Sequence, residues 1–165
     1  ITPVIDRKAK ELGFSRTISI DPASIPIKAW VQEKCKYGCP TYGKKNSCPP
    51  YSHTPTEMKD ILSDFSKAIV IVGEPPLKQY QLNLLELEKF AFTEGYYKAL
   101  ACGCGPCTIC KECDVNNCRV PEKRRPSLES CGCDVFELMN NCGIAIQPLK
   151  NKTDFVQYVS LLLVE

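Results

Sequence analysis

The stretch Ala68-Ile69-Val70-Ile71-Val72 decides the fold, because its five residues form the longest unbroken aliphatic run in the chain. A continuous apolar run of this length is typical of a strand buried on both faces, and the Pro75-Pro76 pair follows it. We therefore predict an interior strand of a sheet here. The run is far shorter than the roughly 20 apolar residues that a membrane-spanning helix needs.

Helices and strands are expected to alternate on either side of this strand. Before it, the sequence predicts a helix over residues 3–13, strands over 14–20 and 29–31, and a helix over 54–65. After it, we expect helices over 77–100 and 134–141, and closing strands over 144–146 and 155–164. The clearest helix start is Thr54-Pro55-Thr56-Glu57, where Thr54 and Glu57 can form a capping box. The alternation predicts an α+β (mixed α/β) fold, with helices packed on a small mixed sheet.

Length and composition favour a single domain over residues 1–165 with an ordinary core, since 44% of the residues are hydrophobic. The net charge is +2, and the basic run Lys123-Arg124-Arg125 has no accompanying aromatic stripe, so we expect no nucleic-acid partner. No signal peptide or membrane span is visible, which favours a cytoplasmic location without membrane attachment. The sequence assigns no oligomeric state.

Seven of the twelve cysteines fall into two compact groups. The first group has the pattern Cys35-x3-Cys39-x8-Cys48. The second group has the pattern Cys107-x2-Cys110-x2-Cys113-x4-Cys118. The second pattern is close to the ferredoxin-type spacing C-x2-C-x2-C-x3-C-P, which holds iron–sulfur clusters. Such close neighbours cannot all find disulfide partners of suitable geometry, so we favour metal binding over a disulfide framework.

Soft thiolate ligands select iron–sulfur clusters, zinc or Cu(I) over hard cations. All-cysteine zinc sites usually consist of two separated C-x2-C pairs, whereas three cysteines in succession suit a cubic cluster better. We therefore predict two [4Fe-4S] clusters, bound by segments at about 35–50 and 102–133, with zinc as the alternative metal. The only histidine is His53, so nothing indicates a Rieske site.

The fourth ligand of the first group is left open by the spacing. Either Cys118 completes the first site, or the second group is self-contained and the first borrows a thiolate from elsewhere. We favour a self-contained second group, because the four-residue gap before Cys118 lets the chain close back. The candidate donors of a borrowed thiolate are Cys102, Cys104, Cys131, Cys133 and Cys142.

Four of these cysteines form the C-x-C pairs Cys102/Cys104 and Cys131/Cys133, which are candidates for additional metal binding. On a strand, a C-x-C pair merely shares one face and needs no metal. The alternative is that some of these thiols are small buried side chains. A buried thiol is also the favoured interpretation of Cys142.

Several motifs together resemble a family catalogued as a domain of unknown function and described as predicted metal-binding proteins, common in methanogens and other strict anaerobes. The motifs are C-x3-C-x2-YG-x4-CPP, GPC-x2-C-x2-C with a following CR-x-P, and RPS-x-E followed by DVF, over roughly residues 30–136. The matching positions are Cys35, Cys39, Tyr42, Gly43, Cys48, Pro49, Pro50, Gly105, Pro106, Cys107, Cys110, Cys113, Cys118, Arg119, Pro121, Arg125, Pro126, Ser127, Glu129 and Asp134. The resemblance implies cytoplasmic metal binding without naming a reaction. The chain departs from that pattern at both C-x-C pairs, where small or apolar residues are more usual.

Three functions are compatible with this sequence. We favour an electron-transfer or redox-accessory protein that passes electrons to or from a redox partner protein, because no substrate-binding motif is recognisable. The second is an enzyme or sulfur-handling protein, in which the three thiolates of Cys35, Cys39 and Cys48 leave one iron open. The third is a zinc-binding structural or interaction module. No catalytic residue is assigned.

Overall fold

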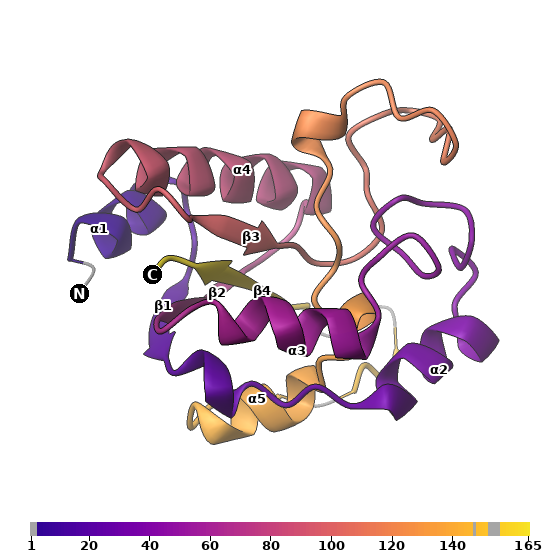
Figure 1. Cartoon of the computed structure of the whole chain (residues 1–165), viewed down its shortest axis with the longest axis horizontal. Coiled ribbons are helices and arrows are strands. Elements are labelled where there is room, and N and C mark those ends of the chain that lie inside the picture. Colours follow the sequence, from indigo (N-terminus) through magenta and orange to yellow (C-terminus); the bar gives the residue numbers. More distant parts are fainter. Residues whose placement is uncertain (1–2, 147, 152–155) are drawn as a thin grey trace.

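The computed structural model describes residues 3–146, 148–151 and 156–165, and a four-stranded sheet lies at its centre (Figure 1). The strand order is β1 (Arg16–Ile20), β2 (Ala68–Gly73), β4 (Tyr158–Leu163) and β3 (Leu100–Cys102). All three strand pairs are antiparallel. Strand β2 is buried along its whole length and has a neighbour on each side, so the predicted interior strand is confirmed.

Helices cover both faces of the sheet, because side chains along β2 and β4 alternate between two apolar clusters. One face packs against α1 (Pro3–Glu11) and α4 (Leu77–Thr93). The other packs against α3 (Pro55–Ser63) and α5 (Val135–Asn141). Figure 1 shows these layers above and below the strands. The α+β class is confirmed, although the sheet is antiparallel throughout the described strands and not mixed.

Local signals in the sequence identify several helix ends correctly. The Thr54 hydroxyl accepts a hydrogen bond from the Glu57 backbone N–H at 3.2 Å, and the Glu57 carboxylate accepts one from the Thr54 N–H at 3.4 Å. These two bonds are the predicted capping box of α3. At the end of α1, Gly13 has φ +92°, a conformation that favours glycine and stops the helix.

Three expectations about secondary structure are wrong. Residues 29–31 are not a strand but the first turn of α2 (Ala29–Gly38), whose Gln, Glu and Lys residues favour a helix. The long helix ends at Thr93, because Gly95 adopts φ +105°, and the chain then forms β3. Residues 144–146 form no strand; Ile144 and Ile146 pack against the apolar cluster beside α5 from an irregular segment. The expected last strand is β4, although position 155 lies outside the described residues.

The cysteine-bearing segments gather at one end of the sheet, beside α2 (Figure 1). The chain leaves β3 at Cys102 and enters a long irregular loop. Gly103 then pairs with the returning segment: its N–H donates to Pro126 at 2.7 Å, and its carbonyl accepts from Leu128 at 2.8 Å. Short 3-10 turns lie at Pro22–Ser24, Pro121–Lys123 and Glu129–Cys131. Among the described helices, none is long and apolar enough to span a membrane.

Candidate metal centre

The four cysteines of the second group line one small pocket, although the loop that carries them has no regular secondary structure. They are Cys107, Cys110, Cys113 and Cys118, and each is half-buried. Burial is the main cause that raises the pKa of Cys107, and the neighbouring charges of Cys113 and Cys110 raise it further. Lys45 acts in the opposite direction. The four residues that the spacing grouped therefore line one common pocket.

One residue that lines this pocket carries a buried, unpaired hydrogen-bond donor. Asn46 lines it, and its Nδ2 atom is buried without a hydrogen-bond partner in the part of the chain that the structure describes. Sulfur atoms of thiolates and inorganic sulfides accept hydrogen bonds, so an amide donor aimed at them is satisfied. Four soft thiol groups fit an iron–sulfur cluster or zinc, and the orphaned donor fits the sulfur atoms around either.

The first cysteine group surrounds the C-terminus of α2. Cys35 is on the helix, Cys39 is its C-cap residue, and Cys48 lies buried in the following loop. The Thr41 hydroxyl lies 3.1 Å from the sulfur of Cys39 and 3.4 Å from that of Cys48. Burial raises the pKa of Cys35 to about 11, with further contributions from the charges of Cys39, Glu129 and Cys48. Three thiols are thus neighbours here.

Ser47 connects the two groups. Its hydroxyl accepts a hydrogen bond from the backbone N–H of Cys107 at 2.7 Å and lies 3.8 Å from the sulfur of Cys48. Its carbonyl accepts from the Ser127 N–H at 3.0 Å and from the Ser130 hydroxyl at 2.9 Å. Ser47 therefore holds three loops together. No sequence motif predicts this role for Ser47, and its position directly before Cys48 is the only signal in the sequence.

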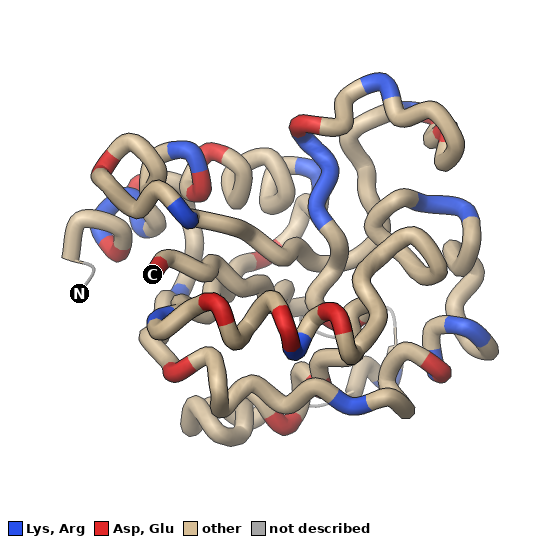
Figure 2. Tube along the Cα trace, viewed as in Figure 1, with Lys and Arg blue, Asp and Glu red and all other residues tan. Residues whose placement is uncertain are grey.

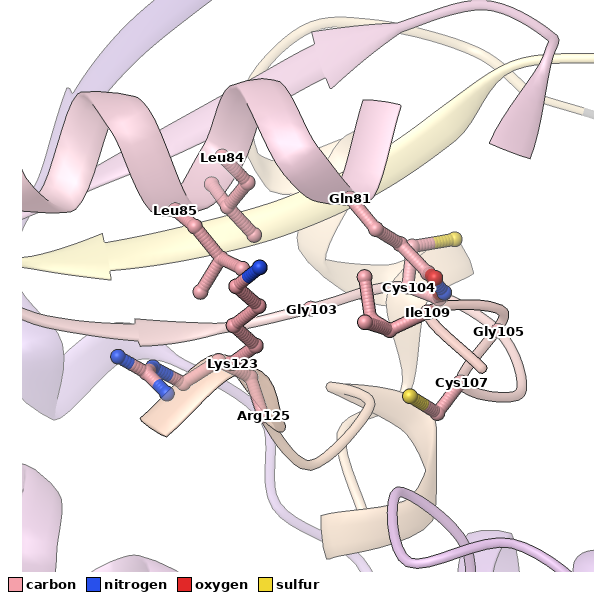
Figure 3. Close-up of a pocket in the computed structure, with 10 residues that line it drawn as sticks. All are labelled: Gln81, Leu84, Leu85, Gly103, Cys104, Gly105, Cys107, Ile109, Lys123 and Arg125. Atoms are coloured by element: carbon pink, nitrogen blue, oxygen red, sulfur yellow. The ribbon is translucent and has the colours of Figure 1, made fainter. Parts of the chain in front are cut away.

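Gln81 on α4 holds the start of the second cysteine loop (Figure 3). Its Nε2 donates to the carbonyls of Cys104 and Pro106, each at 2.9 Å. Its Oε1 accepts from the N–H of Thr108 at 3.0 Å and from its hydroxyl at 2.6 Å. One carboxamide thus makes four hydrogen bonds to the residues on either side of Cys107. Nothing in the helical pattern distinguished Gln81 from other polar positions of α4.

The returning segment is held by an ion pair between Arg125 and Glu88. Arg125 Nη2 lies 2.5 Å from Glu88 Oε1, and Nε donates to Oε2 at 2.9 Å. The same carboxylate accepts the backbone N–H of Ala101 at 2.6 Å. Both side chains are mostly buried, with exposed fractions of 22% and 14%. The pair therefore connects α4 and β3 to the segment that closes the second cysteine loop.

The C-x-C cysteines lie mainly in the apolar core. Cys102, Cys131 and Cys133 belong to the apolar cluster between the sheet and α3 and α5. Burial raises the pKa of Cys131 to about 11 and raises those of Cys102 and Cys133 well above the ordinary thiol value. Such apolar surroundings are typical of cysteines that act as small buried hydrophobic side chains. Their predicted role as additional ligands stays a prediction.

Cys104 and Cys142 differ from these three. The Cys104 thiol lies 3.7 Å from Oε1 of Glu129, and burial raises the pKa values of both groups. In Figure 3 the sulfur atoms of Cys104 and Cys107 point in different directions. Cys142 is half-buried at the C-terminus of α5.

In the described ranges, no three His, Cys, Asp or Glu side chains lie close enough together to hold one metal ion.

Comparison with known proteins gives one finding. Neither a curated protein nor a solved structure matches this chain. A family model described as "Predicted metal-binding protein (DUF2284)" matches residues 18–164, which includes both cysteine groups and both C-x-C pairs. Since the match covers nearly the whole sequence, the chain belongs to this family of predicted metal-binding proteins.

Proposed function

We propose that this protein binds two [4Fe-4S] clusters and transfers electrons. The observation that carries the proposal is the shared pocket of Cys107, Cys110, Cys113 and Cys118, which supplies one thiolate for each iron of a cubic cluster. This is the cluster of the second site; Cys35, Cys39 and Cys48 would hold the other cluster, at the first site, with the fourth ligand undecided. Each bound cluster would supply one-electron oxidation and reduction.

Two features support electron transfer. Ser47 contacts the sulfur of Cys48 and the backbone of Cys107, so a short path joins the two sites. At the first site Cys39 is exposed, and the neighbouring Tyr37 is 79% exposed, which leaves room for a redox partner. Figure 2 shows basic residues recurring along the cysteine-bearing loops, so a partner with an acidic face would be favoured.

A second candidate is a substrate-binding cluster at the first site. Three thiolates lie there, and the carboxylate of Glu129 is the other negative group that raises the pKa of Cys35. A cluster held by three thiolates has one iron free to bind sulfide or a substrate. This arrangement would make the protein an enzyme or a sulfur-handling protein.

Anaerobic purification with metal and sulfide analysis tests the proposal. We expect a brown protein with about eight irons and eight sulfides per chain. A colourless protein with stoichiometric zinc would contradict both functions that depend on an iron–sulfur cluster. It would instead favour a zinc-binding structural module. Electron paramagnetic resonance (EPR) before and after addition of sulfide distinguishes an electron carrier from a protein with an open-iron site. A changed signal favours the open-iron site, and an unchanged one favours the electron carrier.

A further inference from the structure

The side chain of Asn46 holds a buried polar atom without a hydrogen-bond partner. Only 9% of the residue is exposed, and its Nδ2 finds no acceptor among the residues the structure describes. A buried amide donor left unpaired opposes folding, and nearly all such groups in proteins are paired with protein, water or a ligand. The atom therefore indicates that something else accepts its hydrogen bond.

The location of Asn46 identifies the acceptor. Asn46 belongs to the loop between Cys39 and Cys48, yet it lines the pocket formed by the four cysteines of the second group. Its neighbour Ser47 is held in place by the backbone N–H groups of Cys107 and Ser127. Lys45 on its other side lowers the pKa of Cys107 through its charge. Three consecutive residues of the first loop thus face the second site.

The chemistry of the amide decides which atom faces the sulfurs. A carboxamide carries two N–H donors and one oxygen acceptor, whereas thiolate and sulfide sulfurs can only accept. We propose that Asn46 Nδ2 donates a hydrogen bond to a sulfur atom of the cluster held by Cys107, Cys110, Cys113 and Cys118, and so raises its reduction potential. This inference rests on the proposed cluster binding. The direction follows because the donor stabilises the reduced cluster, which carries more negative charge.

The test compares Asn46→Leu with Asn117→Leu in the anaerobically loaded protein. Leucine has the same number and branching of side-chain heavy atoms as asparagine but no donor. Asn117 is an exposed asparagine between Cys113 and Cys118, so it is a matched control. Redox titration followed by EPR gives the potential of each cluster, and the double substitution Cys110→Ala and Cys113→Ala identifies the signal of the second site by its loss.

In Asn46→Leu, we expect the equilibrium constant for reduction of the second cluster to fall about tenfold, which is about 59 mV for one electron. The first cluster and the Asn117→Leu protein should keep their potentials. If Asn46→Leu loads poorly, Asn46→Ala gives the same comparison with a smaller side chain.

Two results would overturn the inference. One is an unchanged potential of the second cluster in a fully loaded Asn46 variant. The other is loss of iron from both Asn46 variants, which would make the residue a structural part of the loop. Failure of the proposed function is distinct from either, because the unmodified protein would then bind no cluster.

Discussion

The hydroxyl of Ser47 accepts a hydrogen bond from the backbone N–H of Cys107 at 2.7 Å, and this contact joins the two cysteine groups across 60 residues of sequence. Ser47 lies directly before the proposed ligand Cys48, and Cys107 is itself a proposed ligand. A change at this contact therefore alters the second site through its backbone, without removing a thiolate.

Ser47→Ala should lower the free energy of unfolding of the loaded protein by about 1–2 kcal/mol, because the Cys107 N–H loses its acceptor. Iron should also leave the second site faster in the presence of a chelator. Urea unfolding and chelator-driven loss of colour measure the two effects. Ser52→Ala is the control: this buried serine donates to Ser130 at 3.2 Å, and its loss should leave iron release unchanged.

Gln81→Ala should destabilise the loaded protein by about 2–3 kcal/mol, since two carbonyls and one N–H in the second cysteine loop lose their partner. Faster iron loss should accompany this change. Gln79 is a matched control on the same helix, because its exposed side chain bonds only to Asn83 in the described structure. Equal iron loss in Gln79→Ala and Gln81→Ala would contradict the assigned role of Gln81.

Arg125→Ala should cost about 3 kcal/mol of unfolding free energy, because it leaves the mostly buried Glu88 carboxylate without its charge partner. The exposed pair of Lys67 and Glu165, at 2.9 Å, is the comparison. Lys67→Ala should cost less than about 1 kcal/mol, since solvent screens exposed pairs. Urea unfolding of both variants measures the two losses of unfolding free energy. Similar losses would contradict the prediction that the buried pair of Arg125 and Glu88 stabilises the fold more than an exposed pair does.

The double substitution Cys110→Ala and Cys113→Ala should reduce the iron content from about eight to about four atoms per chain, because only two of the four proposed ligands of the second site remain. Cys133→Ala should keep all of its iron and lose about 1–2 kcal/mol of stability, since its thiol packs in the apolar core. Metal analysis and urea unfolding measure both. Loss of iron from Cys133→Ala would contradict this and would indicate that the C-x-C cysteines bind metal.

The metal-free protein should become less stable as the pH rises from about 9 to 11. Burial raises the pKa of Cys131 from 9.0 to about 11, so the unfolded chain loses this proton first, which lowers its free energy relative to the folded protein. The stabilisation is present below pH 9, and the two-unit shift corresponds to a loss of about 2.7 kcal/mol. Cys131→Ala should reduce the pH dependence measured by urea unfolding, and the other buried thiols, Cys102 and Cys133, account for part of what remains. An identical slope in both proteins would rule out Cys131 as its source.

Much of the fold follows from local patterns. The apolar run at β2, the capping box of Thr54 and Glu57 and the glycine at position 13 each act over a few residues, so the sequence predicts them correctly. The strand β3 escaped prediction because its three residues are ordered by pairing with β4, which lies some sixty residues further along the chain. The wrong expectation at α2 has another cause: residues 29–31 alone suggest a strand, whereas the Gln, Glu and Lys residues that follow them favour a helix.

The sequence by itself determined the family, the interior strand and the two cysteine groups, because ligand spacing and hydrophobic runs are local properties. Tertiary structure alone decided that Asn46 and Ser47 lie against the second group, and that Gln81 holds its loop. Polar residues of this kind form no recognisable sequence motif, because the backbone groups that they contact are far away in the chain. Only folding of the sheet brings those groups within hydrogen-bonding distance.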